Sequence, residues 1–181
     1  MRYRQVIIRK KSGEEKIVTY CVQKAEEGDM SRIAEIYAYA RAFMAANGNP
    51  TQWGTDRPPL AQLERDITAG NLYVIADGKE IHGVFAFLLG DDPTYAVIYD
   101  GAWHFDKPYG TLHRVAGDGS GGIFAAAVAF AQQHSGYLRI DTHENNKIMQ
   151  HVIEKAGFQR CGRIITDDGT PRIAYDRLRE R

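Results

Sequence analysis

Hydrophobic and polar positions alternate at the start of the chain and then change to a helical period. Residues 3–9 and 17–22 alternate on either side of a turn at residues 11–14, which predicts a β-hairpin. Two helices are predicted next, the second opening at Pro58 and Pro59 after a breaker cluster at residues 47–50. The first has an apolar face made of Ile33, Ile36, Tyr37, Ala40 and Met44.

Period-two alternation returns in the middle of the chain and predicts an interior hairpin. Residues 72–76 and 81–89 flank Asp77 and Gly78, a favoured two-residue turn. The second of these strands is apolar on both faces, so we expect it inside a sheet. Residues 95–99 and 109–116 are predicted as further strands.

The stretch that follows is the most distinctive in the sequence. Residues 117–122 hold four glycines in six positions, and residues 123–134 are apolar almost all round, which predicts a buried helix. A glycine loop before a helix exposes backbone N–H groups at the positive end of the helix dipole, where phosphate binds. A flexible turn before a core helix is the alternative interpretation.

The last third of the chain supplies two more elements and a hairpin. A strand is predicted over residues 137–141, then a helix starting at Asn145 or Asn146, then a hairpin over residues 158–176. Because a helix joins strands 109–116 and 137–141, we expect these two to be parallel. The fold class is therefore α/β, with a strongly twisted, mostly antiparallel mixed sheet and helices on both faces.

The composition of the chain limits the classes of function that it favours. The 181 residues are 44% hydrophobic and 25% charged, with 23 basic and 23 acidic side chains, so no overall charge favours nucleic acid or an anionic membrane. No apolar run is long enough to span a bilayer. Cys21 and Cys161 are expected as reduced thiols of a cytoplasmic protein, with one disulfide as the alternative. The six histidines show no metal-site spacing, so no metal is predicted.

Three segments, taken in order, carry a family resemblance. They are residues 22–29, the strand with its glycine loop and buried helix, and an Asn-x-x-small…Lys-x-Gly-Phe signature. The signature comprises Asn146, Met149, Lys155, Gly157 and Phe158. From about Tyr20 onward the chain resembles the GNAT superfamily of acyl-CoA-dependent N-acyltransferases, and residues 49–53 are similar to a subgroup of its bacterial members.

The resemblance implies one acyltransferase domain over residues 1–181, with an extra N-terminal strand or hairpin at residues 1–20. The implied activity is transfer of an acetyl group from acetyl-CoA to a primary amine of a small molecule or peptide, by direct attack. Many members carry a tyrosine acid where this chain has Ile153. That departure motivates the alternative, a non-catalytic sensor or structural protein that binds an acyl-CoA.

The resemblance also implies a cofactor site. Arg114 begins a match to the family's Arg-x-x-Gly-x-Gly loop, but the pyrophosphate needs free N–H groups of the first helical turn. This requirement favours placing the pyrophosphate later in the loop, next to the helix start. The predicted cofactor contacts are then Gly119, Ser120, Gly121 and Gly122. A strand amide near Val115 would polarise the carbonyl, and Asn146 would lie near the pantetheine arm or simply cap its helix.

The candidates for proton transfer lie at the ends of two strands. His113 could be the base that deprotonates the amine, directly or through water, or a structural histidine bonded to a neighbouring strand. Asp141 and His143 are rivals, and Asp141 could instead cap the following helix.

Loops and edges suggest where partners bind. Trp53, Tyr95 and Trp103 lie in loops, where they could form an acceptor pocket or shield the core. Loops 47–58 and 90–108 should set the acceptor. The N-terminal hairpin and the C-terminal strand are candidate edges for a homodimer.

Overall fold

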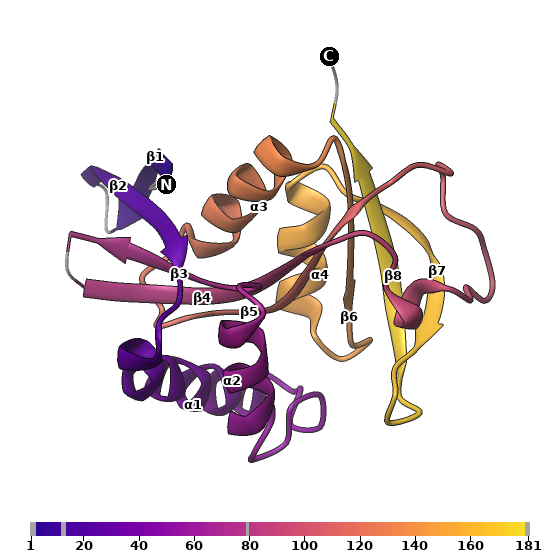
Figure 1. The fold of residues 1–181 in the computed structure, drawn as a ribbon, viewed down its shortest axis with the longest axis horizontal. Coiled ribbons are helices and arrows are strands. Elements are labelled where there is room, and N and C mark those ends of the chain that lie inside the picture. The colour runs from indigo at the N-terminus through magenta and orange to yellow at the C-terminus, as the bar shows by residue number, and fades with distance from the viewer. Residues whose placement is uncertain (1–2, 12–13, 79, 180–181) are drawn as a thin grey trace.

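Eight strands form one sheet in the computed structural model, which describes residues 3–11, 14–78 and 80–179 (Figure 1). The strand order is β1-β2-β3-β4-β5-β6-β8-β7. Neighbours are antiparallel except β5 and β6, which are parallel. The mixed, mostly antiparallel sheet predicted from the sequence is confirmed, including its parallel pair.

Two hairpins build the N-terminal side of the sheet. β1 (Tyr3–Lys11) pairs with β2 (Glu14–Lys24), although the predicted turn between them falls partly outside the described residues. β2 then pairs with β3 (Leu72–Asp77), which forms the second predicted hairpin with β4 (Glu80–Leu89). Because β2 runs to Lys24, the predicted boundary at residue 20 falls inside a strand.

The centre of the sheet splits into two diverging strands. β5 (Gly110–Gly117) and β6 (Tyr137–Thr142) pair only through Gly110 with Leu138 and Thr111 with Arg139. Beyond these pairs the ladder ends, so the carboxyl ends of both strands are free of each other. The connecting helix α3 (Ile123–His134) crosses over this split.

The C-terminal side ends in the predicted hairpin. After α4 (Lys147–Lys155), β7 (Gln159–Ile165) pairs with β8 (Pro171–Leu178), and β8 also pairs with β6. The last strand is therefore interior, and β7 is the edge. This corrects the prediction that the C-terminal strand is an edge available to a homodimer, since β8 lies between β6 and β7.

Helices cover both faces of the sheet (Figure 1). α1 (Met30–Ala46) and α2 (Leu60–Thr68) lie on one face, and α3 and α4 lie on the other. Seven of the twelve residues of α3 are buried, so the prediction of a core helix from its apolar circumference is confirmed. Among the described residues, no helix is long and apolar enough to cross a membrane.

The predicted strand at residues 95–99 is wrong. Pro93–Tyr95 forms a short 3₁₀ helix, because Pro93 cannot donate to a ladder and Asp92 accepts a hydrogen bond from the Thr94 N–H at 2.9 Å. Tyr99 makes only an isolated bridge with Arg163.

The two cysteines are free thiols in this fold. Cys21 lies on β2 and Cys161 on β7, near opposite ends of the strand order. This separation excludes a disulfide between them without refolding of the sheet. The expectation of two unpaired thiols is confirmed.

Candidate functional site

A pocket of about 750 Å³ opens where β5 and β6 separate. Residues 112–116 of β5 and residues 140–142 of β6 line it, together with the starts of α3 and α4. The loop between α1 and α2 and the turn between β7 and β8 close its other side. The end of the parallel ladder thus creates the cavity, because beyond it no strand pairs with the facing edges.

A β-bulge lies on the β5 wall of this pocket. Between His113 and Ala116, β5 advances three residues while β4 advances two. Arg114 lies in the bulge with a φ of +53°, the left-handed region that a residue with a Cβ rarely adopts. The Tyr37 hydroxyl donates to the Arg114 carbonyl at 2.8 Å, and Arg114 Nη2 lies 2.6 Å from Asp66 Oδ2. Helices α1 and α2 therefore hold the bulge, beside which Val115 lines the pocket.

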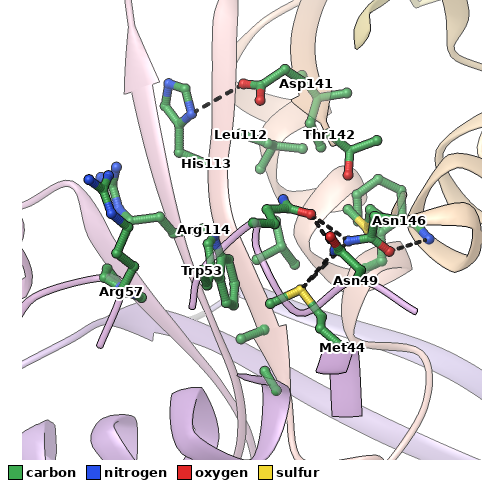
Figure 2. Close-up of a pocket in the computed structure, with 18 of the residues that line it drawn as sticks. Met44, Asn49, Trp53, Arg57, Leu112, His113, Arg114, Asp141, Thr142 and Asn146 are labelled. Carbon is green, nitrogen blue, oxygen red and sulfur yellow. Dashed lines mark hydrogen bonds and ion pairs between the residues drawn. The ribbon is translucent and has the colours of Figure 1, made fainter. Parts of the chain in front are cut away.

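His113 lies on this wall between the carboxylates of Asp92 and Asp141, the second of which Figure 2 shows. Its Nε2 is 2.6 Å from Asp92 Oδ2, and its Nδ1 is 3.9 Å from Asp141 Oδ2. Burial would raise the pKa of Asp92, but the hydrogen bond and charge of His113 and the hydrogen bonds of Thr94 lower it to about 2. An ionised carboxylate only accepts, so in the neutral ring Nε2 carries the proton and Nδ1 is the free acceptor.

Asp141 is held from behind by an aromatic cluster. The Tyr95 hydroxyl donates to Asp141 Oδ2 at 2.8 Å, and Trp103 Nε1 donates to the Tyr95 carbonyl at 3.2 Å. Tyr95 is 1% exposed, and neither Tyr95 nor Trp103 lines the pocket. Their predicted role as direct acceptor contacts is not supported, because the segment from 93 to 109 packs its aromatic rings onto the sheet. They position Asp141 instead.

His143 lies outside the pocket, in the turn before α4. It is buried, and its Nδ1 accepts a hydrogen bond from the Asn145 N–H at 3.1 Å. Burial, with the nearby Arg172 charge, lowers the pKa of His143. A neutral ring that accepts from the backbone is a structural histidine, so of the three predicted catalytic residues only His113 and Asp141 line the cavity.

Three of the four predicted cofactor residues in the glycine loop line the pocket. Gly119, Gly121 and Gly122 have φ angles of +86°, +70° and +77°, a region that favours glycine. Gly122 immediately precedes α3, so the free N–H groups of the first helical turn follow it directly. This geometry fits the later of the two registers considered from the sequence.

Ser120, in contrast, faces away from the pocket. Its hydroxyl lies 3.0 Å from His82 Nδ1, and its N–H donates to Asp118 Oδ1 at 3.0 Å. Asp118 also forms an ion pair with Arg32 at 2.9 Å. Ser120 therefore belongs to a hydrogen-bonded network that anchors the loop, while the glycines on either side of it line the cavity.

Asn146 caps its helix, one of the two roles considered for it, while the role near the pantetheine arm stays a prediction. Its Oδ1 accepts from the Met149 N–H at 3.1 Å, which caps α4, and its Nδ2 donates to Gln52 Oε1 at 2.9 Å (Figure 2). It lines the pocket at the same time. Trp53 also lines the pocket, where its ring packs edge-on against Tyr37 at 5.5 Å.

Two residues of the site were not predicted from the sequence. Asp92 lies in the loop 90–108, which was predicted only as a loop that sets the acceptor, since the pairing of Asp92 with His113 spans 21 positions. Arg172 lies at the start of β8 and lines the pocket, although nothing in its sequence neighbourhood distinguishes it from a surface arginine.

A further cluster lies away from the pocket. His104 Nδ1 is 2.8 Å from Asp176 Oδ1 and 3.3 Å from Cys161 Sγ. Asp176 Oδ2 accepts from the His104 N–H and the Tyr137 hydroxyl at 2.9 and 2.6 Å. The ligand atoms of His104, Cys161 and Asp176 lie within 4.8 Å of one another, a grouping that the sequence spacing did not indicate. Hydrogen bonds account for its geometry.

Three solved structures with the same fold are acetyltransferases by name. A GNAT-family acetyltransferase from Streptococcus agalactiae 2603 is 28% identical, with a TM-score of 0.79, over 90% of this chain and 96% of that chain. An aminoglycoside N(6')acetyltransferase from Legionella pneumophila is 12% identical, with a TM-score of 0.60, over 88% and 91% of the two chains.

A third similar structure is the ribosomal-protein-alanine N-acetyltransferase from Brucella melitensis. It is 16% identical, with a TM-score of 0.58, over 87% of this chain and 98% of that chain. Comparison with models of protein families and with curated proteins found no match. The structural matches cover almost the full length of both chains, so this chain has the fold of the GNAT superfamily of acyl-CoA N-acyltransferases.

Proposed function

We propose that this protein is an N-acetyltransferase that moves an acetyl group from acetyl-CoA to a primary amine of a small molecule or peptide. The observation that carries the proposal is the position of His113. Its free Nδ1 faces a cavity that also receives the glycine loop and the start of α3. A base and an anion-binding helix start thus open into one space, as amine acylation by a phosphate-bearing thioester requires.

The residues of the glycine loop fit the pyrophosphate of acetyl-CoA. Gly119 lies at φ +86°, where a Cβ would be strained and would lie 2.6 Å from the Tyr39 hydroxyl, so glycine lets the loop take this course beside the pocket. The pantetheine arm would pass between β5 and β6, with Asn146 beside it. Acetyl-CoA supplies the activated thioester, and the backbone at the bulge near Val115 would orient its carbonyl.

His113 has the geometry of the base. An alkylammonium has a pKa near ~10, so the acceptor must lose a proton before its nitrogen attacks. Nδ1 would accept that proton, directly or through water, while ionised Asp92 stabilises the resulting imidazolium through Nε2. The 3.9 Å gap between Nδ1 and Asp141 leaves room for an amine N–H that donates to both groups.

The leaving thiolate has no tyrosine acid at the position where many GNAT members carry one. Ile153 occupies it and is fully buried in the core. A thiol of pKa ~8.5 is a fair leaving group without such an acid, so this substitution lowers the expected rate but does not abolish transfer.

The fold does not name the acceptor. Two of the similar structures are named for different amines, an aminoglycoside and a ribosomal-protein alanine. In this chain the α1–α2 loop and the β7–β8 turn close the side of the pocket beyond His113, and their side chains would select the acceptor.

Two measurements test the proposal. Acetyl-CoA is titrated into the protein by calorimetry, and thiol release is then followed over a panel of primary amines. We expect saturable binding followed by amine-dependent release. Absence of binding up to millimolar ligand would refute the proposal, whereas binding with release no faster than in buffer would support the non-catalytic acyl-CoA-binding alternative that Ile153 motivates.

A further inference from the structure

Arg172 is a buried cation with almost no partners. The residue is 7% exposed and lines the pocket from the start of β8. Of its donor groups, Nη2 reaches the Gln52 carbonyl only at 3.5 Å, and Nε lies 3.9 Å from Asp141 Oδ1. Nη1 has no hydrogen-bond partner among the described residues. A guanidinium carries five N–H donors, so most of its capacity is unused.

The other carboxylates near Arg172 are engaged elsewhere. Asp168 forms an ion pair with Arg57 at 2.9 Å and accepts from the Thr166 hydroxyl and the Thr170 N–H. Asp141 accepts from Tyr95 through its other oxygen. A buried charge without a close counter-charge is costly, so an arginine in this state indicates a site that a ligand completes.

Besides Arg114 Nε on the β5 bulge, two more unsatisfied polar atoms belong to residues of the pocket wall. Thr142 Oγ1 and Asn49 Oδ1 are buried and have no hydrogen-bond partner in the part of the chain that the structure describes. Thr142 lies at the end of β6, next to Asp141, and Asn49 lies in the α1–α2 loop (Figure 2). This side of the cavity therefore offers unused donors and acceptors, whereas the α3 side is mostly backbone and apolar.

The position of Arg172 separates it from the expected pyrophosphate site. The strand order is β5, β6, β8, so Arg172 lies on the far side of β6 from β5 and from the glycine loop. Asp141 lies between His113 and Arg172, 3.9 Å from each. An amine at His113 and an anion at Arg172 would thus be separated by the width of one carboxylate.

We propose that Arg172 binds an anionic oxygen group, a carboxylate or a phosphate, on the acceptor, which carries this group a short distance from the amine that is acetylated. The inference rests on the proposed acetyltransferase function and narrows its acceptor class. A guanidinium fork suits both anions, because it donates two parallel hydrogen bonds to paired oxygens.

Matched acceptor pairs test the inference. β-Alanine is compared with propylamine, and O-phosphoethanolamine with ethanolamine, at fixed acetyl-CoA. For one anionic acceptor we expect kcat/KM about 10- to 100-fold above its neutral partner, the range of a charge-assisted hydrogen-bonded pair. Arg172→Gln should remove this advantage, so that the anionic and neutral partners give similar kcat/KM, and Arg172→Lys should restore part of it. The pair of acceptors that shows the difference in kcat/KM identifies the anion as a carboxylate or as a phosphate.

Arg163→Gln is the matched control. Arg163 lies on the neighbouring strand β7, is exposed, pairs with Asp100 and does not line the pocket, so its loss should leave the preference intact. Melting temperatures check that each variant is folded. Equal kcat/KM for anionic and neutral partners, with Arg172→Gln indistinguishable from wild type, would overturn the inference while leaving the acetyltransferase function standing.

A binding measurement keeps the test independent of turnover. N-Acetyl-β-alanine and N-acetylpropylamine are titrated into wild type and Arg172→Gln by calorimetry. Tighter binding of the acid to wild type, lost in the variant, supports the inference even if no acceptor is acetylated. Equal binding of both probes to both proteins rejects the inference. It is also rejected if Arg172→Gln binds the acid as tightly as wild type does, since either result means that Arg172 does not contact the anion.

Discussion

His113 Nε2 lies 2.6 Å from Asp92 Oδ2, and this contact assigns opposite roles to the two ring nitrogens. Since Asp92 is ionised, Nε2 keeps its proton and Nδ1 remains free to accept one on the side of the pocket that holds Asp141. The carboxylate therefore fixes the tautomer and stabilises the charged ring without touching the acceptor. The arrangement follows the general logic of a base oriented by a second group.

His113→Gln should lower kcat by roughly 10²- to 10³-fold, because general-base catalysis contributes on this order. The acetyl-CoA dissociation constant should stay the same, since the glycine loop lies at the other end of β5. The pH profile of the residual rate should lose the limb that reports the base. Steady-state kinetics across pH, with calorimetry for binding, measure all three quantities.

His151→Gln is the control for this prediction. His151 is an exposed residue of α4 that does not line the pocket, so its loss should leave rate and pH profile as in wild type. An unchanged profile in His113→Gln would instead assign the histidine a purely structural role bonded to Asp92.

Asp92→Asn should make stability less sensitive to acid. The pKa of Asp92 is about 2 in the fold against its ordinary value of 3.8, so the native state favours the ionised form by about 2 kcal/mol. That contribution is complete above pH ~4 and is lost as the pH falls toward 2. Denaturant unfolding at several pH values should show wild type more stable than the variant by about 1–2 kcal/mol at pH 7, with the difference vanishing near pH 2. A constant difference would contradict the pairing.

Gly119→Ala should weaken acetyl-CoA binding about tenfold. A Cβ at φ +86° is strained by roughly 1–2 kcal/mol and would meet the Tyr39 hydroxyl at 2.6 Å, so the loop backbone or the Tyr39 side chain must shift. Gly28→Ala is the control, because nothing lies within 4 Å of a Cβ there. Calorimetry with CoA measures both. Unchanged affinity in Gly119→Ala would move the pyrophosphate site away from this part of the loop.

The fold followed from patterns that are local in sequence. Alternation predicted both N-terminal hairpins, and the apolar circumference of residues 123–134 predicted a buried helix. Both predictions were possible because the spacing of apolar residues shows which faces of a strand or helix are buried. The error at residues 95–99 has the same origin. An apolar run after Pro93 resembles a strand, but Tyr95 packs into the core and the backbone pairs only at the isolated bridge between Tyr99 and Arg163.

The site could be predicted only in part, because its pairs are distant in sequence. The glycine loop and His113 each stand out by type and position on a single element. Asp92 and Arg172 become significant only when strand pairing brings them beside His113 and Asp141. Ser120 shows the opposite error, a residue predicted to contact the cofactor that does not line the pocket. The sequence does not show which loop residues face the cavity, and in the structure the Ser120 hydroxyl lies beside His82 instead.

Cys161 should resist alkylation in the native protein although its neighbour His104 suggests an activated thiol. Burial, reinforced by the Asp176 carboxylate, raises the pKa of Cys161 to about 12, so the thiolate fraction at pH 8 is on the order of 10⁻⁴. Iodoacetamide at pH 8, followed by peptide mass mapping, should modify the half-buried Cys21 first and Cys161 only after unfolding. Cys161→Ser should give the same native labelling at Cys21. Rapid native labelling of Cys161 would mean that His104 holds a thiolate there, and the hydrogen-bonded cluster would then be a reactive or metal-binding centre instead of a structural one.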